Sequence, residues 1–255
     1  MTSKALMLAA ALAMLVCGAI NVRAAELRLL CPVAMRAVMP EIIVQFEKAT
    51  GDKLSTEYAT AGAVADRVQQ GDAADVAIAS TTQIDTLLGQ GRIAAGTRSQ
   101  IARVGIGVFV RAKAARPDLT SVDSFRRTLG EAKAIGYGDP AKGGVSGTYM
   151  ASLVDRLGMA ADLNGKTKLF GDSQAVLTAL AAGDIDIGIG LSSDTVLAAG
   201  VEFVAGLPAQ IQNFTYYSGG VISGSKQVDA ASSLVAFLTS PTARAVLTAK
   251  GFEPQ

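Results

Sequence analysis

The residues with the clearest chemical potential lie in the stretch Ile135–Val154, within the sequence AIGYGDPAKGGVSGTYMASLVDRLG. A short apolar strand leads into a loop of Gly, Asp, Pro and Lys, and an amphipathic helix follows. Glycines at 143, 144 and 147 let backbone N–H groups approach a ligand closely, and a helix N-terminus favours negative charge. We therefore expect a small anion to bind here. An ordinary glycine-rich turn between a strand and a helix is the alternative.

Comparable loops recur along the chain, each after a short apolar strand and before a helix. In sheets of parallel strands, ligands bind outside the carboxyl ends of the strands. We therefore expect the loops of each half to face a shared site. They are Pro32–Met35, Thr60–Ala63 and Ser80–Thr82 in the first half, and Gly143–Gly147, Ser173–Gln174 and Leu191–Ser193 in the second.

Two cations in or beside these loops could hold a carboxylate. Arg36 could pair with it bidentately, and Lys142 could act as a point charge. The alternatives are a solvated helix position for Arg36 and plain surface for Lys142. Asp184 and Asp186 resemble metal ligands but bracket the start of a strand, so we expect a solvated turn and no metal. Further polar groups are Thr60, Ser80, Ser146, Thr148, Ser192 and Gln174, with Tyr149, Tyr216 and Tyr217 as candidates for a pocket wall.

The composition excludes several kinds of chemistry. The chain has no His, which removes His-based catalysis and most zinc sites, and it has no Trp. Its 23 basic and 22 acidic residues give no sign of nucleic-acid binding. No cofactor-binding motif is present, so we expect no cofactor.

The first 24 residues have the features of an export signal. Lys4 provides the positive charge, Ala5–Val16 the apolar segment, and Val22–Ala24 an acceptable cleavage site. No other apolar run is long enough to cross a membrane. We therefore expect an exported, soluble and monomeric protein. Only Cys31 would remain after cleavage, which excludes an internal disulfide.

Strands and helices alternate along the rest of the chain, which predicts an α/β fold with mostly parallel sheets. Ser192–Asp194 is expected to cap a helix. The expected strands are 27–31, 54–59, 74–79, 104–111, 169–172, 186–191 and 216–223, with a further short strand that begins at Ile135. Helices are expected up to about 49, from 60–62 through 70, near 83–90, over 124–132, after the loop 143–147, from 173–174 through 182, after Asp194, over 229–237 and from 240–241 to 250–251.

The order and spacing of these segments resemble the periplasmic solute-binding proteins of ABC importers, in particular the molybdate-binding type. The resemblance covers nearly the whole chain after the leader. It rests on LRLLCPVAMRAVMPEIIVQFEKATG, YATAGAVADRVQQGDAADVAIAS, AIGYGDPAKGGVSGTYM, GDIDIGIGLSSD and LTSPTARAVLTAKGFEP. It implies the two-lobed type II fold, with lobe 1 formed by 25–108 plus 220–255 and lobe 2 by 109–219. The chain would cross between the lobes near Val108–Arg111 and Ser218–Val221.

The resemblance also implies which positions contact the ligand. The serines of the first and second loops fall at Ala34 and at Ala61 or Gly62, and the tyrosine of lobe 2 falls at Leu191. Ser146 and Gln174 match the remaining contacts. Most hydroxyls expected for a tetrahedral oxyanion are therefore missing, so an organic carboxylate is favoured over molybdate, tungstate or sulfate. The full predicted ligand set is Ala34, Met35, Arg36, Thr60, Ala61, Gly62, Ser80, Lys142, Gly144, Val145, Ser146, Gly147, Gln174, Leu191 and Ser192.

The leading functional hypothesis is a binding protein that captures a small anion and delivers it to an ABC permease. The alternative is a periplasmic isomerase of a tricarboxylate, similar to aconitate isomerase, which would need a base and anion clamps. Asp139, Lys142 or Tyr149 could supply the base. A ligand-bound partner of a membrane sensor is a third possibility, which the sequence does not separate from transport.

Overall fold

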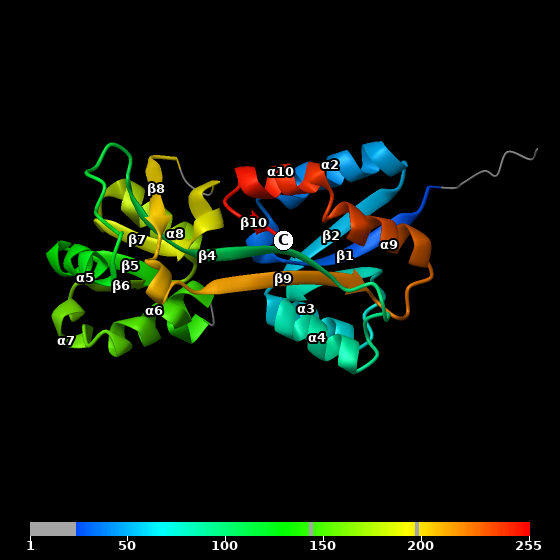
Figure 1. Ribbon diagram of the computed structural model, residues 1–255, viewed down its shortest axis with the longest axis horizontal. Coiled ribbons are helices and arrows are strands. Elements are labelled where there is room, and N and C mark those ends of the chain that lie inside the picture. Colours follow the sequence, from blue (N-terminus) through cyan, green and yellow to red (C-terminus); the bar gives the residue numbers. More distant parts are fainter. Residues whose placement is uncertain (1–23, 143–144, 197–198) are drawn as a thin grey trace, which may run out of the picture.

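Two α/β lobes joined by two long strands make up the structure (Figure 1). The computed structural model describes residues 24–142, 145–196 and 199–255. Residues 1–23 of the predicted leader and Gly144 of the predicted site lie outside this part of the chain. The predicted α/β class is confirmed, with parallel strand pairs in each lobe.

Lobe 1 is built on three parallel strands in the order β2-β1-β3. Helices pack on both faces of this sheet, and the C-terminal strand β10 pairs with β4. The elements are β1 (Glu26–Pro32), η2 (Val33–Met35), α2 (Met39–Thr50), β2 (Lys53–Ala59), α3 (Ala61–Gln69), β3 (Val76–Ser80), α4 (Thr81–Gly89), α9 (Val228–Phe237), α10 (Pro241–Ala249) and β10 (Glu253–Pro254).

Lobe 2 repeats the scheme with parallel strands in the order β7-β5-β6. One strand, β8, was not predicted: it pairs antiparallel with β4, and its residues are half-buried throughout, so they show no clear alternation. The elements are α5 (Val122–Glu131), β5 (Ile135–Gly138), η3 (Pro140–Lys142), α6 (Val145–Arg156), α7 (Ala160–Leu163), β6 (Thr167–Phe170), α8 (Ser173–Ala182), β7 (Ile187–Leu191), η4 (Ser192–Val196), β8 (Val201–Gly206) and η5 (Ala209–Ile211).

Side-chain caps explain where several helices begin. The side chains of Thr60, Ser80, Ser121, Asp172 and Ser240 each accept a hydrogen bond from the backbone N–H three residues later. Such caps satisfy a donor that the first helical turn leaves unpaired. The prediction that Ser192–Asp194 caps an α-helix is wrong. These residues form the 3-10 helix η4, and the Asp194 carboxylate accepts from the N–H of Leu191, which precedes it.

The strands β4 (Ser99–Arg111) and β9 (Phe214–Val221) run between the lobes. β4 pairs with β9 over Ser99–Gly105 and then with β7 and β8 over Ile106–Arg111. The side-chain amide of Gln212 bridges this exchange of partners. It accepts from the Ile106 N–H at 2.9 Å and donates to the Ile106 carbonyl at 3.0 Å.

The exchange of strand partners suggests a boundary between the lobes. Val108–Arg111 pair with strands of lobe 2, and Ser218–Val221 pair with β3 of lobe 1. We propose the boundaries 105/106 and 213/214, a few residues before those implied by the resemblance.

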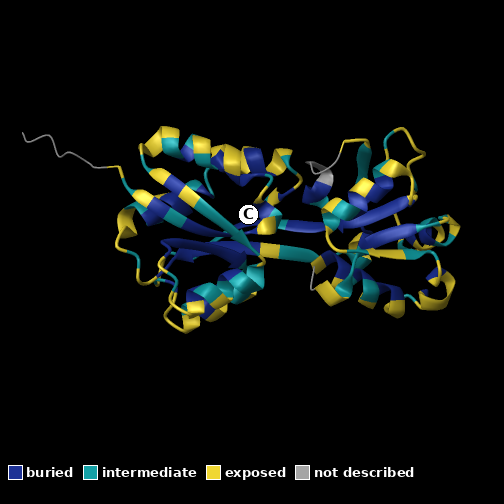
Figure 2. Cartoon of the chain, turned by 180° about the vertical axis from the view of Figure 1, so that it is seen from behind, coloured by how far each residue is buried: buried dark blue, intermediate teal, exposed yellow. Residues whose placement is uncertain are grey.

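A continuous hydrophobic core runs through both lobes along β4, with a smaller cluster beside it in each lobe. Figure 2 shows the buried strands within each lobe and the exposed outer faces of the helices. In the described ranges, no single helix is long and apolar enough to cross a membrane. Helices α9 and α10 pass that test only together, with a bend of 52° between them.

Candidate functional site

The predicted loops lie at the carboxyl ends of the parallel strands in both lobes. In lobe 1, β1, β2 and β3 lead into η2, α3 and α4. In lobe 2, β5, β6 and β7 lead into η3 with α6, into α8 and into η4. Because parallel strands end at the same edge of a sheet, each lobe gathers its three loops at one edge. We refer to these segments as the carboxyl-end loops.

Arg36 follows η2 and lies over the ring of Tyr58, with its guanidinium carbon 5.0 Å from the ring centroid. Tyr58 is the β2 residue paired with Cys31 of β1, and burial raises the pKa of its phenol to about 12. The guanidinium forms no ion pair with any described residue. An arginine held by stacking on an aromatic ring keeps its donors free for a carboxylate.

The other predicted residues of lobe 1 contribute few free donors. Met35 is fully buried, so its side chain belongs to the core. The Thr60 hydroxyl accepts from the Ala63 N–H at 3.2 Å, which leaves its own proton available. The Ser80 hydroxyl donates to Gln83 Oε1 at 2.7 Å and is therefore engaged in the capping box. Ala34, Ala61 and Gly62 are half-buried and offer only backbone groups.

In lobe 2, Gly147 brings the start of α6 against the end of β5. A Cβ at residue 147 would overlap the carbonyl oxygen of Gly138 and lie 2.6 Å from its carbon, so only glycine fits. Ser146 is 7% exposed, and its hydroxyl has no partner among the described residues. Lys142 and Val145 are exposed on either side of residues 143–144.

The remaining predicted residues lie on two further loops of lobe 2. Gln174 is exposed in the first turn of α8, and Leu191 is buried at the end of β7. The Ser192 hydroxyl donates to the carbonyl of Gly251, which belongs to the turn after α10 in lobe 1. Ser192 therefore contacts the other lobe in addition to its predicted place at the ligand site.

Asp194, which was predicted only as part of a helix cap, is a buried titratable group. Its Oδ2 accepts from the Leu191 N–H at 2.7 Å, and it forms a hydrogen bond with Ser173 at the start of α8. Burial raises the pKa of Asp194 to about 6, and the nearby Asp172 charge also raises it. The carboxylate in turn helps to raise the pKa of the buried Tyr217. Asp194 thus joins two carboxyl-end loops.

Replacing Asp194 by Asn should make the protein more stable at pH 8 by on the order of 1–3 kcal/mol. The folded state raises the pKa of Asp194 from 3.8 to about 6, so the protonated carboxyl favours folding. This contribution to the free energy of unfolding is complete below pH 3.8 and is lost as the pH rises through 6. An amide removes this loss while it can still accept from Leu191 and donate to Ser173. Urea unfolding of both proteins at pH 4 to 8 measures the difference. Asp66→Asn, on an exposed face of α3, is the control, and an unchanged pH dependence in Asp194→Asn would contradict the assignment.

Of the three candidate bases named from the sequence, Asp139 and Tyr149 have side chains that form hydrogen bonds. The Asp139 carboxylate accepts from the Ala141 N–H at 2.9 Å within the η3 turn. The Tyr149 hydroxyl donates to the Ile211 carbonyl at 2.7 Å and accepts from Arg156 at 3.0 Å. Lys142 is exposed. Among the described residues, no group of three His, Cys, Asp or Glu side chains could hold a metal.

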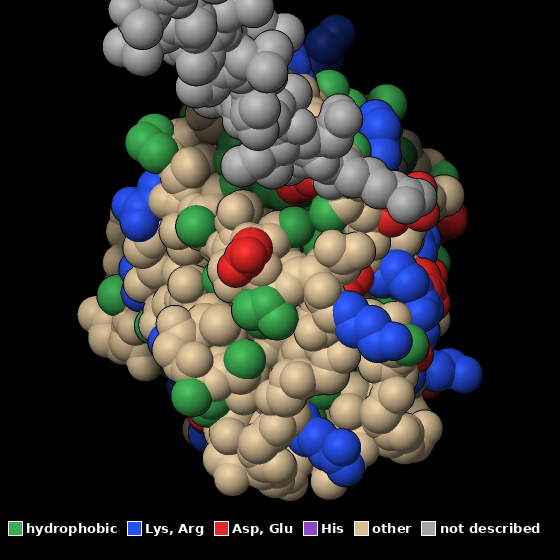
Figure 3. All heavy atoms as spheres, turned by 90° about the vertical axis from the view of Figure 1, so that its right-hand side faces the viewer, with side chains coloured by type: hydrophobic (Ala, Val, Ile, Leu, Met, Phe, Trp, Pro, Cys, Tyr) green, Lys and Arg blue, Asp and Glu red, His purple; other side chains and the backbone are tan. Residues whose placement is uncertain are grey.

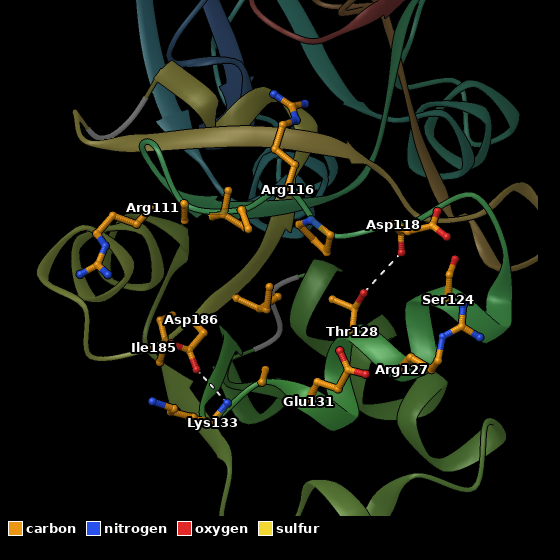
Figure 4. Close-up of a pocket in the computed structure, with 16 residues that line it drawn as sticks. Arg111, Arg116, Asp118, Ser124, Arg127, Thr128, Glu131, Lys133, Ile185 and Asp186 are labelled. Atoms are coloured by element: carbon orange, nitrogen blue, oxygen red, sulfur yellow. Dashed lines mark hydrogen bonds between the residues drawn. The ribbon is translucent and has the colours of Figure 1, made fainter.

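Two hollows lie away from the carboxyl-end loops. One of about 500 Å³ in lobe 2 lies between α5, the connector after β4 and the start of β7 (Figure 4). Arg111, Arg116 and Lys133 extend away from its centre, and Asp118 and Asp186 are bonded to neighbours. The other, of about 460 Å³, lies in lobe 1. Neither is lined by a predicted site residue, so we do not assign the site to them.

The outer end of lobe 1 carries a mixed surface. In Figure 3, basic and acidic side chains are scattered among neutral ones, and hydrophobic side chains occur singly or in small groups. The visible part of this face therefore offers no concentrated charge for a large polyanion.

The fold is that of the type II periplasmic binding proteins. The family model for "bacterial extracellular solute-binding protein" matches residues 27–253, so the chain belongs to this family. It is 29% identical over 220 residues to an aconitate isomerase of Pseudomonas sp, which covers 84% of this chain and 82% of that protein. It is 23% identical to the molybdate-binding protein ModA of Escherichia coli K12, with 84% of each chain covered.

Solved structures agree with this fold. The substrate-binding domain assigned to a molybdenum ABC transporter of Clostridium difficile has a TM-score of 0.78 at 22% identity, covering 90% of this chain and 99% of that one. The periplasmic molybdate-binding protein of Azotobacter vinelandii has a TM-score of 0.67 at 18% identity, covering 89% and 98%. The predicted resemblance is confirmed.

Proposed function

We propose that this protein captures a small organic carboxylate between its lobes as the receptor of an ABC importer. The observation that carries the proposal is Arg36, which stacks on Tyr58 at a carboxyl-end loop and has no acidic partner among the described residues. A planar guanidinium matches the two oxygens of a carboxylate. Lys142, Ser146 and the start of α6 would complete the site from lobe 2.

The inventory of donors supports a carboxylate over a metal oxyanion. A buried tetrahedral oxyanion needs donors around all its oxygens, since each unpaired polar group is costly to bury. Ser80 and Ser192 already donate to Gln83 and Gly251. Of the four hydroxyls in the predicted ligand set, only those of Thr60 and Ser146 then remain as donors, and Ala34, Ala61 and Leu191 stand where further polar side chains would be needed.

A thermal-shift panel of carboxylates and oxyanions tests the proposal. A ligand at about 100 times its Kd should stabilise the folded state by about 2.7 kcal/mol. We expect a rise in Tm with one or more di- or tricarboxylates and none with molybdate, tungstate or sulfate. A rise with an oxyanion alone would contradict the proposal.

A second proposal is an isomerase that acts on a tricarboxylate. It is supported by the 29% identity to an aconitate isomerase and by a buried carboxyl at the carboxyl-end loops, Asp194, whose pKa of about 6 suits a general base. The base would take a proton from one carbon next to the double bond. The double bond would shift, and a proton would return to the carbon at its far end, which balances atoms and charge.

Proton NMR of cis-aconitate with the purified protein in D₂O separates the two proposals. The isomerase proposal predicts trans-aconitate with deuterium at the reprotonated carbon, and loss of this product in Asp194→Asn. If cis-aconitate is converted no faster than in buffer alone, the isomerase proposal is contradicted and the receptor proposal stands.

Export and delivery belong to the receptor proposal. Residues 1–24 would direct a monomer to the periplasm, where it would hand its ligand to an ABC permease. The Azotobacter vinelandii protein, which has the same fold, is a periplasmic binding protein, and this supports the proposed location. Osmotic-shock release of the protein from its host cells is the expected result, and retention with the cytoplasm would contradict it.

A further inference from the structure

The lobes touch outside the two long strands, where the turn after α10 meets η4. The Ser192 Oγ of η4 donates to the Gly251 carbonyl at 2.8 Å. Gly251 has a φ of +81°, a left-handed conformation that glycine adopts without strain. The turn after α10 lies near the middle of the molecule in Figure 1, beside the strands that join the lobes.

The contact is tightly packed. A Cβ on Gly251 would lie 2.6 Å from the Ser192 carbonyl oxygen, 3.0 Å from its carbon and 3.3 Å from the Ser193 Cα. All three are backbone atoms, so the clash could not be relieved by turning a side chain. Any residue other than glycine must push the turn and η4 apart.

The turn is fixed to lobe 1. The Phe252 N–H donates to the Leu247 carbonyl at 3.0 Å. The Phe252 ring is buried and meets the ring of Tyr217 edge-on, at 6.3 Å between centroids. Strand β10 then pairs with Ala102 and Arg103 of β4, in the half that belongs to lobe 1.

η4 is equally fixed to lobe 2. It follows β7 directly, and the Asp194 carboxylate ties it back to the Leu191 N–H and across to Ser173 of α8. A shift of η4 is therefore transmitted to two carboxyl-end loops that carry predicted ligand residues.

We propose that Gly251 is a positioning residue of the ligand site: through its contact with η4 it sets the angle between the lobes and holds the loop after β7 in place. This contact between Gly251 and Ser192–Ser193 is a third connection between the lobes, in addition to β4 and β9, and we call it the joint. The effect on ligand capture rests on the proposed function, whereas the effect on the lobe angle does not.

Distance measurement between spin labels tests the proposal without a ligand. Labels are attached at Gln69→Cys on α3 and Asp162→Cys on α7, both exposed, in a Cys17→Ser background with Cys31 buried. Gly251→Ala should broaden the inter-lobe distance distribution and shift its centre by several ångström, because the joint is opened. An unchanged distribution in folded Gly251→Ala would overturn the proposal.

The matched control is Gly51→Ala. Gly51 has nearly the same φ, +82°, but nothing lies within 4 Å of a Cβ placed there. It should carry the same backbone strain and leave the distance distribution unchanged. A shift as large in Gly51→Ala as in Gly251→Ala would show that strain, and not the joint, is responsible.

A second pair of variants decides the question if Gly251→Ala does not fold. Ser192→Ala removes the donor to Gly251 and should broaden the distribution. Ser193→Ala removes a neighbouring buried hydroxyl that has no hydrogen-bond partner within residues 24–142, 145–196 and 199–255, and should leave the distribution unchanged. Equal distributions in these two variants would overturn the proposal, whatever the thermal-shift panel shows for ligand binding.

Discussion

Gly147→Ala is expected to lower the free energy of unfolding by about 3 kcal/mol or more, at the upper end of the range for overpacking. The added Cβ would overlap the Gly138 carbonyl oxygen and lie 3.1 Å from its Cα. Both are backbone atoms of β5, so α6 would have to move away from the strand. Ser146 and the helix N-terminus would move with it, and ligand affinity should fall as well. Urea denaturation monitored by circular dichroism measures the loss.

A matched control is Gly130→Ala, on α5. Gly130 also lies in a helix, but nothing is within 4 Å of a Cβ placed there. It should gain up to about 1 kcal/mol from the better helix propensity of alanine. If both variants changed stability by the same amount, the close approach of α6 to β5 would not be the cause.

Arg36→Met should weaken carboxylate binding by about 10- to 100-fold, because hydrogen bonds to a charged group contribute about 1.5–3 kcal/mol. Methionine keeps much of the aliphatic length and removes the guanidinium. Arg36→Lys should recover part of the loss, since it restores the charge but not the bidentate geometry. Stability should change little because Arg36 is exposed.

The control for charge alone is Arg126→Met, an exposed position on α5 away from the carboxyl-end loops. It should leave affinity within error of the unmodified protein. If Arg36→Met bound the carboxylate as tightly as the unmodified protein, Arg36 would not be part of the site. It would then be the solvated helix residue given as the alternative in the sequence analysis.

Much of the fold could be predicted because local signals agreed with it. Apolar strands that alternate with helices predicted most of the elements, and the caps at Thr60, Ser121 and Ser240 stabilise three of the helices where they begin. The order of strands could not be read locally, since it depends on pairings between residues far apart. The half-buried strand β8 and the 3-10 helix η4 carry no regular period, so their type was missed.

In the candidate site, too, some features could be predicted from local sequence and others depend on contacts between distant residues. Loop positions followed from strand ends, and Gly147 followed from the density of glycines. Whether a hydroxyl is available to a ligand depends on its tertiary contacts. The Ser80 hydroxyl donates to the Gln83 side chain, and the Ser192 hydroxyl donates to the Gly251 carbonyl of the other lobe. Asp194 resembled a helix cap in the sequence, and only its burial beside Ser173 sets it apart.

The most direct test of the central claim is titration calorimetry of the purified protein with citrate, cis-aconitate, trans-aconitate and succinate, and in parallel with molybdate and tungstate. If a carboxylate is the ligand, we expect a Kd of about 1 μM or below; a Kd of about 1 μM corresponds to a binding free energy of about −8 kcal/mol. We predict such binding for at least one carboxylate, a large loss in Arg36→Met, and no heat of binding for either oxyanion. Binding of molybdate or tungstate more tightly than every carboxylate would contradict the account, as would the absence of binding by any of these anions.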